Sequence, residues 1–439
     1  MKMRSIYLSL IIIGFFSNAG AQVVYGLKDC IRIGLEKNFS ILIARNSEAI
    51  SKNNYSLGNA GFLPSLDLSS TYSGSVTNTT QNLTAGGQSI TNGVQATSAY
   101  AGASLGLTIF NGFSVQTTYK KLYELKQMGE LNTQLTIENY IATLLSVYYG
   151  YIQQEKLVIN MKFAVTLSKE RLRIDEERYL LGSNSKLQVL QSRVYLNADS
   201  SNLSHQIETL RATQIQLNEL MAVEDMSTQF ILKDTAIQVK PDLVYEKLLE
   251  ETLKSNTSLL IATKNKVIST YDYKLAVSRA YPYLNFSAGY SYTLNTLPAS
   301  SYKNQLIDGA NYGLTLGVNI FNGFNTRREI KNSAINIKTN ELRLAEIEQS
   351  VKADLITIYS AYSNNLRLIN LEEQNLETAT ENLSIALERY KLGSLSGIDL
   401  REVQKSLLDA KERLLSIQYQ AKLAEISLFQ ISGRVMDYY

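Results

Sequence analysis

Few residues in this sequence have the types and spacing that catalysis or metal binding requires. The chain has one cysteine, Cys30, and one histidine, His205, which is too few for a zinc site of Cys and His ligands or an internal disulfide framework. Cys30 lacks the small apolar residues that precede a lipid-attachment cysteine, so we expect it as a small buried side chain on the first helix. No serine, cysteine or carboxylate constellation carries a supporting motif. We therefore expect no catalytic residue, no metal site and no cofactor.

The remaining polar motifs are typical of helix ends. Gly182 and Gly393 suit the left-handed residue that terminates a helix. A serine or threonine followed three residues later by an acidic residue or glutamine can cap the start of a helix. Such pairs predict three helix starts: Ser185 with Gln188, Ser396 with Asp399, and Thr326 with Glu329.

The first residues resemble a secretory signal. Lys2 and Arg4 precede a short apolar run, Ile6 to Phe16, and small residues at 19–21 precede an expected cleavage before Gln22. The run is too short for a spanning helix, and a retained anchor is the alternative. Without residues 1–21 the chain keeps 41 of its 43 Lys and Arg residues against 40 Asp and Glu, a net charge of +1. This balance argues against nucleic-acid binding, which favours a strongly basic face.

The sequence contains an internal duplication. Ile-Phe-Asn-Gly-Phe at 109–113 recurs at 320–324, and Arg-Tyr-x-Leu-Gly-Ser at 178–183 recurs at 389–394, both shifted by 211 residues. A proline after the first helix and a Leu-x-x-Asn motif within that helix also occur twice. The expected organisation is a first structural repeat (22–221), a polar linker (222–243), a second structural repeat (244–432) and a short tail (433–439).

Each repeat should contain five parts in the same order. Proline is absent from 65–240 and 299–439, which permits long uninterrupted helices. At 1.5 Å per residue the long helices would span roughly 100 Å, so two shorter helices placed end to end would match one long helix. The strands should then lie at one end of a rod and the glycine turns at the other. The parts are a helix (27–61, 242–280), a β-hairpin (64–110, 282–321), a long helix (114–180, 325–391), a glycine turn, and a shorter helix (187–221, 398–432).

The predicted strands have the pattern of a membrane barrel. In 284–294 and 312–320, apolar residues alternate with small uncharged ones, and 66–72 and 105–109 repeat this more weakly. About ten residues suffice for a strand to cross a bilayer. Four strands cannot close a barrel alone, and open strand edges are not tolerated in lipid. Several chains must therefore assemble.

Aromatic residues gather near the predicted strand ends. Aromatic rings favour the membrane–water interface, and packing inside a protein core is the alternative. The residues are Tyr100, Phe110, Phe113, Tyr283, Phe321 and Phe324.

Apolar spacing changes along the second long helix. From Ile347 to Ile369 it follows an eleven-residue repeat, which does not require a left-handed supercoil. From Leu376 to Tyr390, and again from Leu400 to Leu414, it follows heptads, which favour left-handed pairing. The helix is expected to run nearly straight near the strands and to coil with its antiparallel partner near the glycine turn. The first repeat shows this change less clearly.

Together these motifs resemble the TolC family of outer-membrane factors over nearly the whole mature chain. The resemblance implies a mainly α fold with a membrane β part: duplicated long-helix hairpins form an α-helical tunnel, and four strands per chain contribute to a trimeric 12-stranded β-barrel. It also implies a homotrimer in the cell outer membrane, a tunnel projecting into the periplasm, a periplasmic adaptor and an inner-membrane pump. The implied function is a passive exit duct for tripartite efflux or type I secretion, without chemistry.

The same resemblance gives roles to particular residues at the glycine turns. Gly182, Ser183, Gly393 and Ser394 would form tips on which adaptor hairpins dock, a turn without a partner being the alternative. Family members have acidic rings at the closed aperture, and motif alignment places Asp399 and Glu402 there, one helical turn apart on one face.

Three copies of Asp399 near a threefold axis would repel one another and attract cations. Asp399 as a helix cap and Glu402 as a solvated charge is the alternative. Tyr390 matches a latch tyrosine of the family, but Leu395 stands where the family has an arginine, so the latch differs.

Three other classes of protein fit the sequence less well. A periplasmic coiled-coil adaptor would also have a signal and helical hairpins, but would not need four lipid-type strands. A diffusion porin would need more strands and no 100 Å helices. A secreted enzyme would need a catalytic constellation. Drugs, metal ions, small metabolites and secreted proteins all leave through such ducts, so the sequence leaves the cargo and the pump class open.

Overall fold

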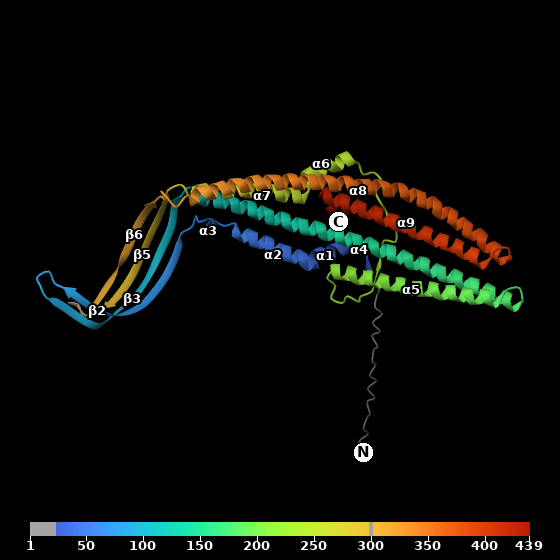
Figure 1. The fold of residues 1–439 in the computed structure, drawn as a ribbon, viewed down its shortest axis with the longest axis horizontal. Helices are drawn as coiled ribbons and strands as arrows, with labels where there is room; N and C mark the ends of the chain where they lie inside the picture. Colours follow the sequence, from blue (N-terminus) through green and yellow to red (C-terminus); the bar gives the residue numbers. More distant parts are fainter. Residues whose placement is uncertain (1–22, 298–301) are drawn as a thin grey trace, which may run out of the picture.

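The computed structural model describes residues 23–297 and 302–439. The expected signal peptide, 1–21, lies outside the described residues. Figure 1 shows an elongated molecule with a sheet at one end and paired helices that run to the other. None of the described helices combines the length and the hydropathy that a membrane-spanning helix needs.

Two helices of 67 residues each, α4 (Ser114–Leu180) and α8 (Asn325–Lys391), form the length of the molecule and span about 100 Å. Each is flanked by one helix near the sheet and by one that returns from its far end (Figure 1). This confirms the predicted end-to-end arrangement of the shorter helices. The flanking helices are α2 (Phe39–Asn54) and α5 (Lys186–Leu220) beside α4, and α7 (Thr257–Ser278) and α9 (Gly397–Ile431) beside α8.

The helices predicted at 27–61 and 242–280 are not continuous. The first divides into α1 (Leu27–Lys37), α2 and the single turn α3 (Leu57–Ala60), and the second into α6 (Tyr245–Ser255) and α7.

An asparagine lies at the equivalent break in each repeat. Asn38 caps α2 and Asn256 caps α7 through their side-chain oxygens. Their amide groups donate to the carbonyls of Leu220 (3.1 Å) and Ile431 (2.9 Å), at the ends of α5 and α9. The Leu-x-x-Asn motif is therefore a junction that joins short helices end to end.

Two of the three predicted capping pairs are confirmed. The hydroxyls of Ser185 and Ser396 accept the N–H groups of Gln188 and Asp399. The pair Thr326 and Glu329 is wrong as a cap, because α8 already begins at Asn325. There Glu329 binds Arg279 at 2.5 Å instead.

The strand-to-helix junctions have an unusual backbone. Phe113 and Phe324, the residues before α4 and α8, have φ values of 63° and 62°, and the glycines before them are also left-handed. A bulky residue rarely adopts this conformation. The repeated Asn-Gly-Phe motif therefore sets the sharp change of direction between strand and helix.

The four antiparallel strands lie in the order β2-β3-β5-β6. The helices that adjoin the strands follow the same spatial order, because α2 contacts α4, α4 contacts α7, and α7 contacts α8. The chain thus forms one curved wall, four elements wide, from sheet to helices. The strands are β2 (Ser65–Asn82), β3 (Gln88–Asn111), β5 (Tyr283–Thr296) and β6 (Asn304–Gly317).

The strand register confirms the predicted alternation. Leu66 lies opposite Leu105, which lies opposite Ala288, and Phe286 lies opposite Leu314, so apolar residues align across all four strands. On the other face, for example, Ser104 lies opposite Gly289. One face of the sheet is therefore predominantly apolar and the other mostly small and polar.

One of the six aromatic residues is not at a strand end. Tyr100 lies in the middle of β3 opposite Thr293, on the polar face. Phe110 packs edge-to-face on Phe113 at 5.2 Å between ring centroids, and Phe321 packs on Phe324 in the same way at 5.3 Å. Tyr283 begins β5.

The segments expected as a linker and a tail are packed into the middle of the molecule. β1 (Val23–Tyr25) pairs in parallel with β4 (Phe230–Leu232), whose Phe230 and Leu232 are buried in the main apolar core. After α9, the 3-10 helix η1 (Val435–Tyr438) folds back, and its Val435 joins the same core. Cys30 is fully buried there, as predicted, and burial raises the pKa of its thiol to about 12.

Candidate functional site at the hairpin tips

The two glycine turns, far from the sheet, are built alike. Gly182 and Gly393 have φ values of +75° and +82°, which favour glycine. Ser183 donates its N–H (2.9 Å) and its hydroxyl (3.1 Å) to the carbonyl of the arginine five residues earlier, and Ser394 makes the same two bonds. These four residues thus terminate α4 and α8. The docking of an adaptor on these residues stays a prediction.

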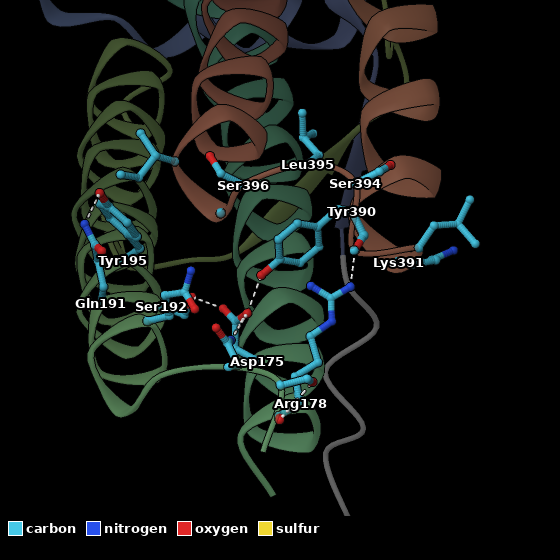
Figure 2. A pocket seen from close by; sticks show the side chains of 17 residues that line it. Asp175, Arg178, Gln191, Ser192, Tyr195, Tyr390, Lys391, Ser394, Leu395 and Ser396 are labelled. Carbon is cyan, nitrogen blue, oxygen red and sulfur yellow. Dashed lines mark hydrogen bonds between the residues drawn. The ribbon is translucent and has the colours of Figure 1, made fainter. Parts of the chain in front are cut away.

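A groove of about 780 Å³ lies between the two tips. It is open to solvent, and Figure 2 shows residues of both helical hairpins on its walls. Polar side chains of both turns and of the starts of α5 and α9 line it, among them Ser183, Asn184, Gln188, Ser394 and Ser396.

A buried carboxylate lies at the base of this groove. Asp175 of α4 is 3% exposed. Ser192 of α5 donates to one of its oxygens at 2.5 Å, and Asn184 (3.0 Å) and the hydroxyl of Tyr390 donate to the other. Figure 2 shows these bonds converging on Asp175. Because Tyr390 belongs to α8, this cluster of Asp175, Ser192, Asn184 and Tyr390, here named the tip layer, joins the two helical hairpins.

Tyr390, for which a latch role is predicted, is buried between the two hairpins, and its role as a latch stays a prediction. Burial and its hydrogen bond to Asp175 raise the pKa of Tyr390, so the hydroxyl stays protonated and donates. Arg178, from the first repeat, donates to the backbone carbonyl of Tyr390, and its guanidinium lies 4.9 Å from the ring centroid. Leu395, in place of the family's arginine, packs against an apolar cluster formed by α4, α8 and α9.

A second polar cluster lies one heptad, about 10 Å, further from the tips. Asp199 of α5 is 4% exposed and accepts the hydroxyl of Ser168 of α4 at 2.5 Å. Arg401 of α9 binds both oxygens of Asp199, at 2.7 and 2.8 Å. The hydrogen bonds to Asp199 raise the pKa of the Arg401 guanidinium. We name Ser168, Asp199 and Arg401 the upper layer.

Our sequence reasoning missed both carboxylates, although a signal for them existed. Under the 211-residue shift, four polar residues of these layers correspond to apolar seam residues of the second repeat. Polar residues at seam positions of a coiled coil are costly unless they are paired, so they indicated a polar cluster. The pairs are Ser168 with Ala379, Asp175 with Ala386, Ser192 with Val403, and Asp199 with Ala410.

The three residues predicted for the aperture do not form one cluster. Asp399 and Glu402 are exposed on α9, whereas Tyr390 is buried between the hairpins. The carboxylate of Asp399 accepts the hydroxyl of Ser396 at 2.7 Å, which gives it a role at the helix cap. Their role at an aperture stays a prediction, because it depends on other copies of the chain.

Comparisons with known proteins agree on one family. A family model described as outer membrane efflux protein matches residues 248–434. The outer membrane protein TolC of Vibrio cholerae serotype O1 is 24% identical over 197 residues, 44% of either chain. The proteases secretion protein PrtF of Dickeya chrysanthemi is 20% identical over 296 residues, 65% of this chain and 62% of PrtF. The matches therefore span less than two thirds of either relative.

A solved structure establishes the fold over almost the whole chain. The CmeC outer membrane channel of Campylobacter jejuni superimposes with a TM-score of 0.77 at 14% identity, covering 93% of this chain and 86% of CmeC. At this identity the likeness concerns the fold alone.

Proposed function

We infer from these matches that the chain is a TolC-like outer-membrane factor, and we propose that it is the outer-membrane exit duct of a tripartite efflux or type I secretion system. It is an outer-membrane protein with its helical part in the periplasm. Three copies would form a twelve-stranded barrel and a continuous helical tunnel, through which cargo passes without chemistry. The observation that carries the proposal is the wall of four strands and four helices, whose two sides are unpaired in the part of the chain that the structure describes.

Both sides of this wall are suited to another copy of the chain. Within the described residues, β2 and β6 each have one unpaired edge. The helices beside those edges expose apolar stripes: Phe39, Ile43 and Ile50 of α2 are 60–71% exposed, and Ile335 and Leu342 of α8 are 62–63% exposed. Contact between the β2 side of one copy and the β6 side of the next is head-to-tail, and such contacts close into a ring when the rotation between copies divides a full turn. This seals all strand edges, as lipid requires.

The tips are the proposed docking site of a periplasmic adaptor, which would connect the duct to an inner-membrane pump. The groove between Ser183 and Ser394 presents hydroxyl and amide groups of both hairpins to the periplasm. A photo-crosslinking probe at either serine should capture the adaptor in intact cells. Identification of the captured protein would also indicate the pump class.

We propose that the tip layer and an acidic ring together close the periplasmic aperture. The bond from Tyr390 to Asp175 holds the second hairpin against the first. Asp399 and Glu402 begin α9 at the same end and are solvent-exposed. Three copies of both carboxylates around a threefold axis would concentrate cations at the entrance.

Neutralising this ring should change conduction. The double variant Asp399→Asn and Glu402→Gln is expected to raise the conductance of reconstituted channels and to weaken block by divalent cations, because the carboxylates that would hold a blocking cation at the entrance are neutralised. The measurement is single-channel current in planar bilayers with and without a divalent cation. Unchanged conductance with unchanged block would remove the aperture assignment.

Removing the latch hydroxyl should also favour the open tip. Tyr390→Phe leaves the buried Asp175 with one donor fewer, which costs about 1–3 kcal/mol in the closed arrangement. We expect a rise of roughly 5- to 150-fold in the open-to-closed ratio, read from single-channel recordings. The matched control is Tyr179→Phe, the equivalent tyrosine in the first repeat, which is 45% exposed. An equal rise in both variants would contradict the latch.

Membrane fractionation and gel mobility test the function as a whole. A heat-modifiable, trimer-sized band in the outer-membrane fraction, together with channel conductance after reconstitution, is the expected result. A soluble periplasmic monomer would instead favour the alternative of a coiled-coil adaptor.

A further inference from the structure

We propose that the upper layer is a second lock between the helical hairpins, separate from the tip layer, and that the neighbouring buried Arg171 weakens this lock so that the tunnel can open. The proposal deepens the proposed channel function and rests on it. Its test includes a readout that does not depend on conductance.

The locking contact is the bidentate bond between Arg401 and Asp199. Asp199 lies on α5, in the first hairpin, and Arg401 lies on α9, in the second. The two bonds are 2.7 and 2.8 Å long, and the carboxylate side chain is 5% exposed. Separating the hairpins would break both bonds at once. Removing Arg401 alone would leave Asp199 buried with only the hydroxyl of Ser168 as a partner.

Arg171 is the opposing element. This residue of α4 is 1% exposed, and its Nε and Nη2 atoms meet no acceptor among the described residues. Its Nη1 reaches Oε1 of Gln404 only at 3.4 Å, and the amide nitrogen of Gln404 is also buried without a described partner. A buried donor without a partner costs free energy, and more so when it carries charge. Water can reach these groups when α4 and α9 move apart, which favours the open arrangement.

The two arginines lie beside the same aromatic ring. Their guanidinium carbons are 4.8 Å (Arg171) and 5.2 Å (Arg401) from the ring centroid of Tyr195. Burial, and next the charge of Arg401, lower the pKa of Arg171. The charges of Asp175 and Asp199 act in the opposite direction, but among the described residues only Arg401 forms an ion pair with Asp199. In the proposed mechanism, repulsion between the two guanidinium groups opposes the bond that holds the hairpins together.

Three single substitutions separate these roles. Arg401→Met removes the lock but keeps an apolar stem, and Arg171→Met removes the unpartnered charge. Arg413→Met is the matched control, because Arg413 of α9 also binds a nearly buried carboxylate, Glu372 of α8, at 3.2 and 3.3 Å, but within the second hairpin. All three variants remove one arginine and add one methionine.

The primary measurement is amide hydrogen exchange of the purified oligomer at the starts of α5 and α9, residues 186–196 and 397–404. We expect exchange there to be roughly 100-fold faster in Arg401→Met, because an uncompensated buried charge is strongly unfavourable. Exchange should be roughly tenfold slower in Arg171→Met, because an unpartnered buried charge is relieved, and unchanged in Arg413→Met. Single-channel recordings should show more opening in Arg401→Met and less in Arg171→Met.

Each contrary result would contradict a specific part of the proposal. Equal exchange in Arg401→Met and Arg413→Met would remove the lock, and faster exchange in Arg171→Met would show that Arg171 supports the closed tip. If exchange changes as expected but no variant and no parent protein conducts, the lock stands and the channel function fails. If the parent conducts and exchange does not change, the channel stands and the lock fails.

Discussion

Replacing Leu314 by arginine is expected to prevent assembly in the outer membrane, whereas the same change at the neighbouring Thr315 is expected to be tolerated. Leu314 lies opposite Phe286 on the apolar face of the sheet, and Thr315 lies opposite Asn285 on the polar face. In the proposed barrel the first face contacts lipid and the second faces the interior. An arginine on the lipid face costs up to about 2–4 kcal/mol per chain, with the largest cost at the bilayer centre and a smaller one toward the interface, and each trimer would carry three.

The measurement is the amount of heat-modifiable oligomer in the outer-membrane fraction of cells that express each variant. We expect Leu314→Arg to be nearly absent from that fraction, and Thr315→Arg to accumulate close to the level of the parent protein. Equal accumulation of the two variants would show that the two faces of the sheet do not meet different environments. The proposed barrel would then be wrong, because its strands must alternate between lipid and interior.

Replacing Glu425 by leucine is expected to cause the second large loss, in this case of folding stability. Glu425 of α9 is fully buried and binds three groups: the amine of Lys422 at 2.9 Å, the hydroxyl of Tyr438 at 2.6 Å and the N–H of Lys240 at 2.9 Å. These contacts join α9 to η1 and to the segment before α6. Burial lowers the pKa of Lys422, whereas the charge of Glu425 raises it.

In Glu425→Leu, Lys422 is left without its carboxylate in a site where its side chain is 4% exposed. Removing one partner of a buried ion pair costs about 3–5 kcal/mol. The double variant Glu425→Leu with Lys422→Met should recover part of this loss, because an apolar pair needs no compensation. Thermal unfolding followed by helical circular dichroism measures the change.

A surface pair is the control for this prediction. Glu388 and Lys391 also form a bond three residues apart on a helix, at 3.0 Å, but both side chains are at least half exposed. Exposed pairs contribute about 0–1 kcal/mol, so Glu388→Leu should leave the unfolding midpoint almost unchanged. A loss in Glu388→Leu as large as that in Glu425→Leu would contradict the importance of burial.

The two polar layers explain how the hairpins can hold and still separate. Each layer has an Asp–Ser pair within the first hairpin and accepts one donor from the second: the hydroxyl of Tyr390 in the tip layer and the guanidinium of Arg401 in the upper layer. The coil of α8 and α9 has a mainly apolar seam instead, with Leu383, Leu400 and Leu407 buried in a cluster that also includes Ile174 of α4. Polar contacts can be exchanged for water when the hairpins part, whereas an apolar seam stays together.

Local and periodic features of this protein follow from the sequence alone. The duplication, the long helices without proline, the alternating strands and the glycine turns predict the element order and the arrangement of a rod with strands at one end. Each of these features is set by nearby residues: alternation defines two faces of a strand, and glycine supplies the left-handed residue at Gly182 and Gly393. Cys30 was likewise correctly expected in the core.

Contacts between distant segments required the tertiary structure. The sequence around Asn38 does not distinguish it from a residue inside a helix. Only the structure shows that its amide donates to the carbonyl of Leu220, 182 positions away at the end of α5. Asp175 and Asp199 resemble surface charges in the sequence. In the structure Tyr390 of α8 donates to Asp175, and Arg401 of α9 donates to Asp199. The cost of burying a polar group depends on the partners that surround it. Those partners come from the other repeat, so only the packing of the two hairpins could reveal them.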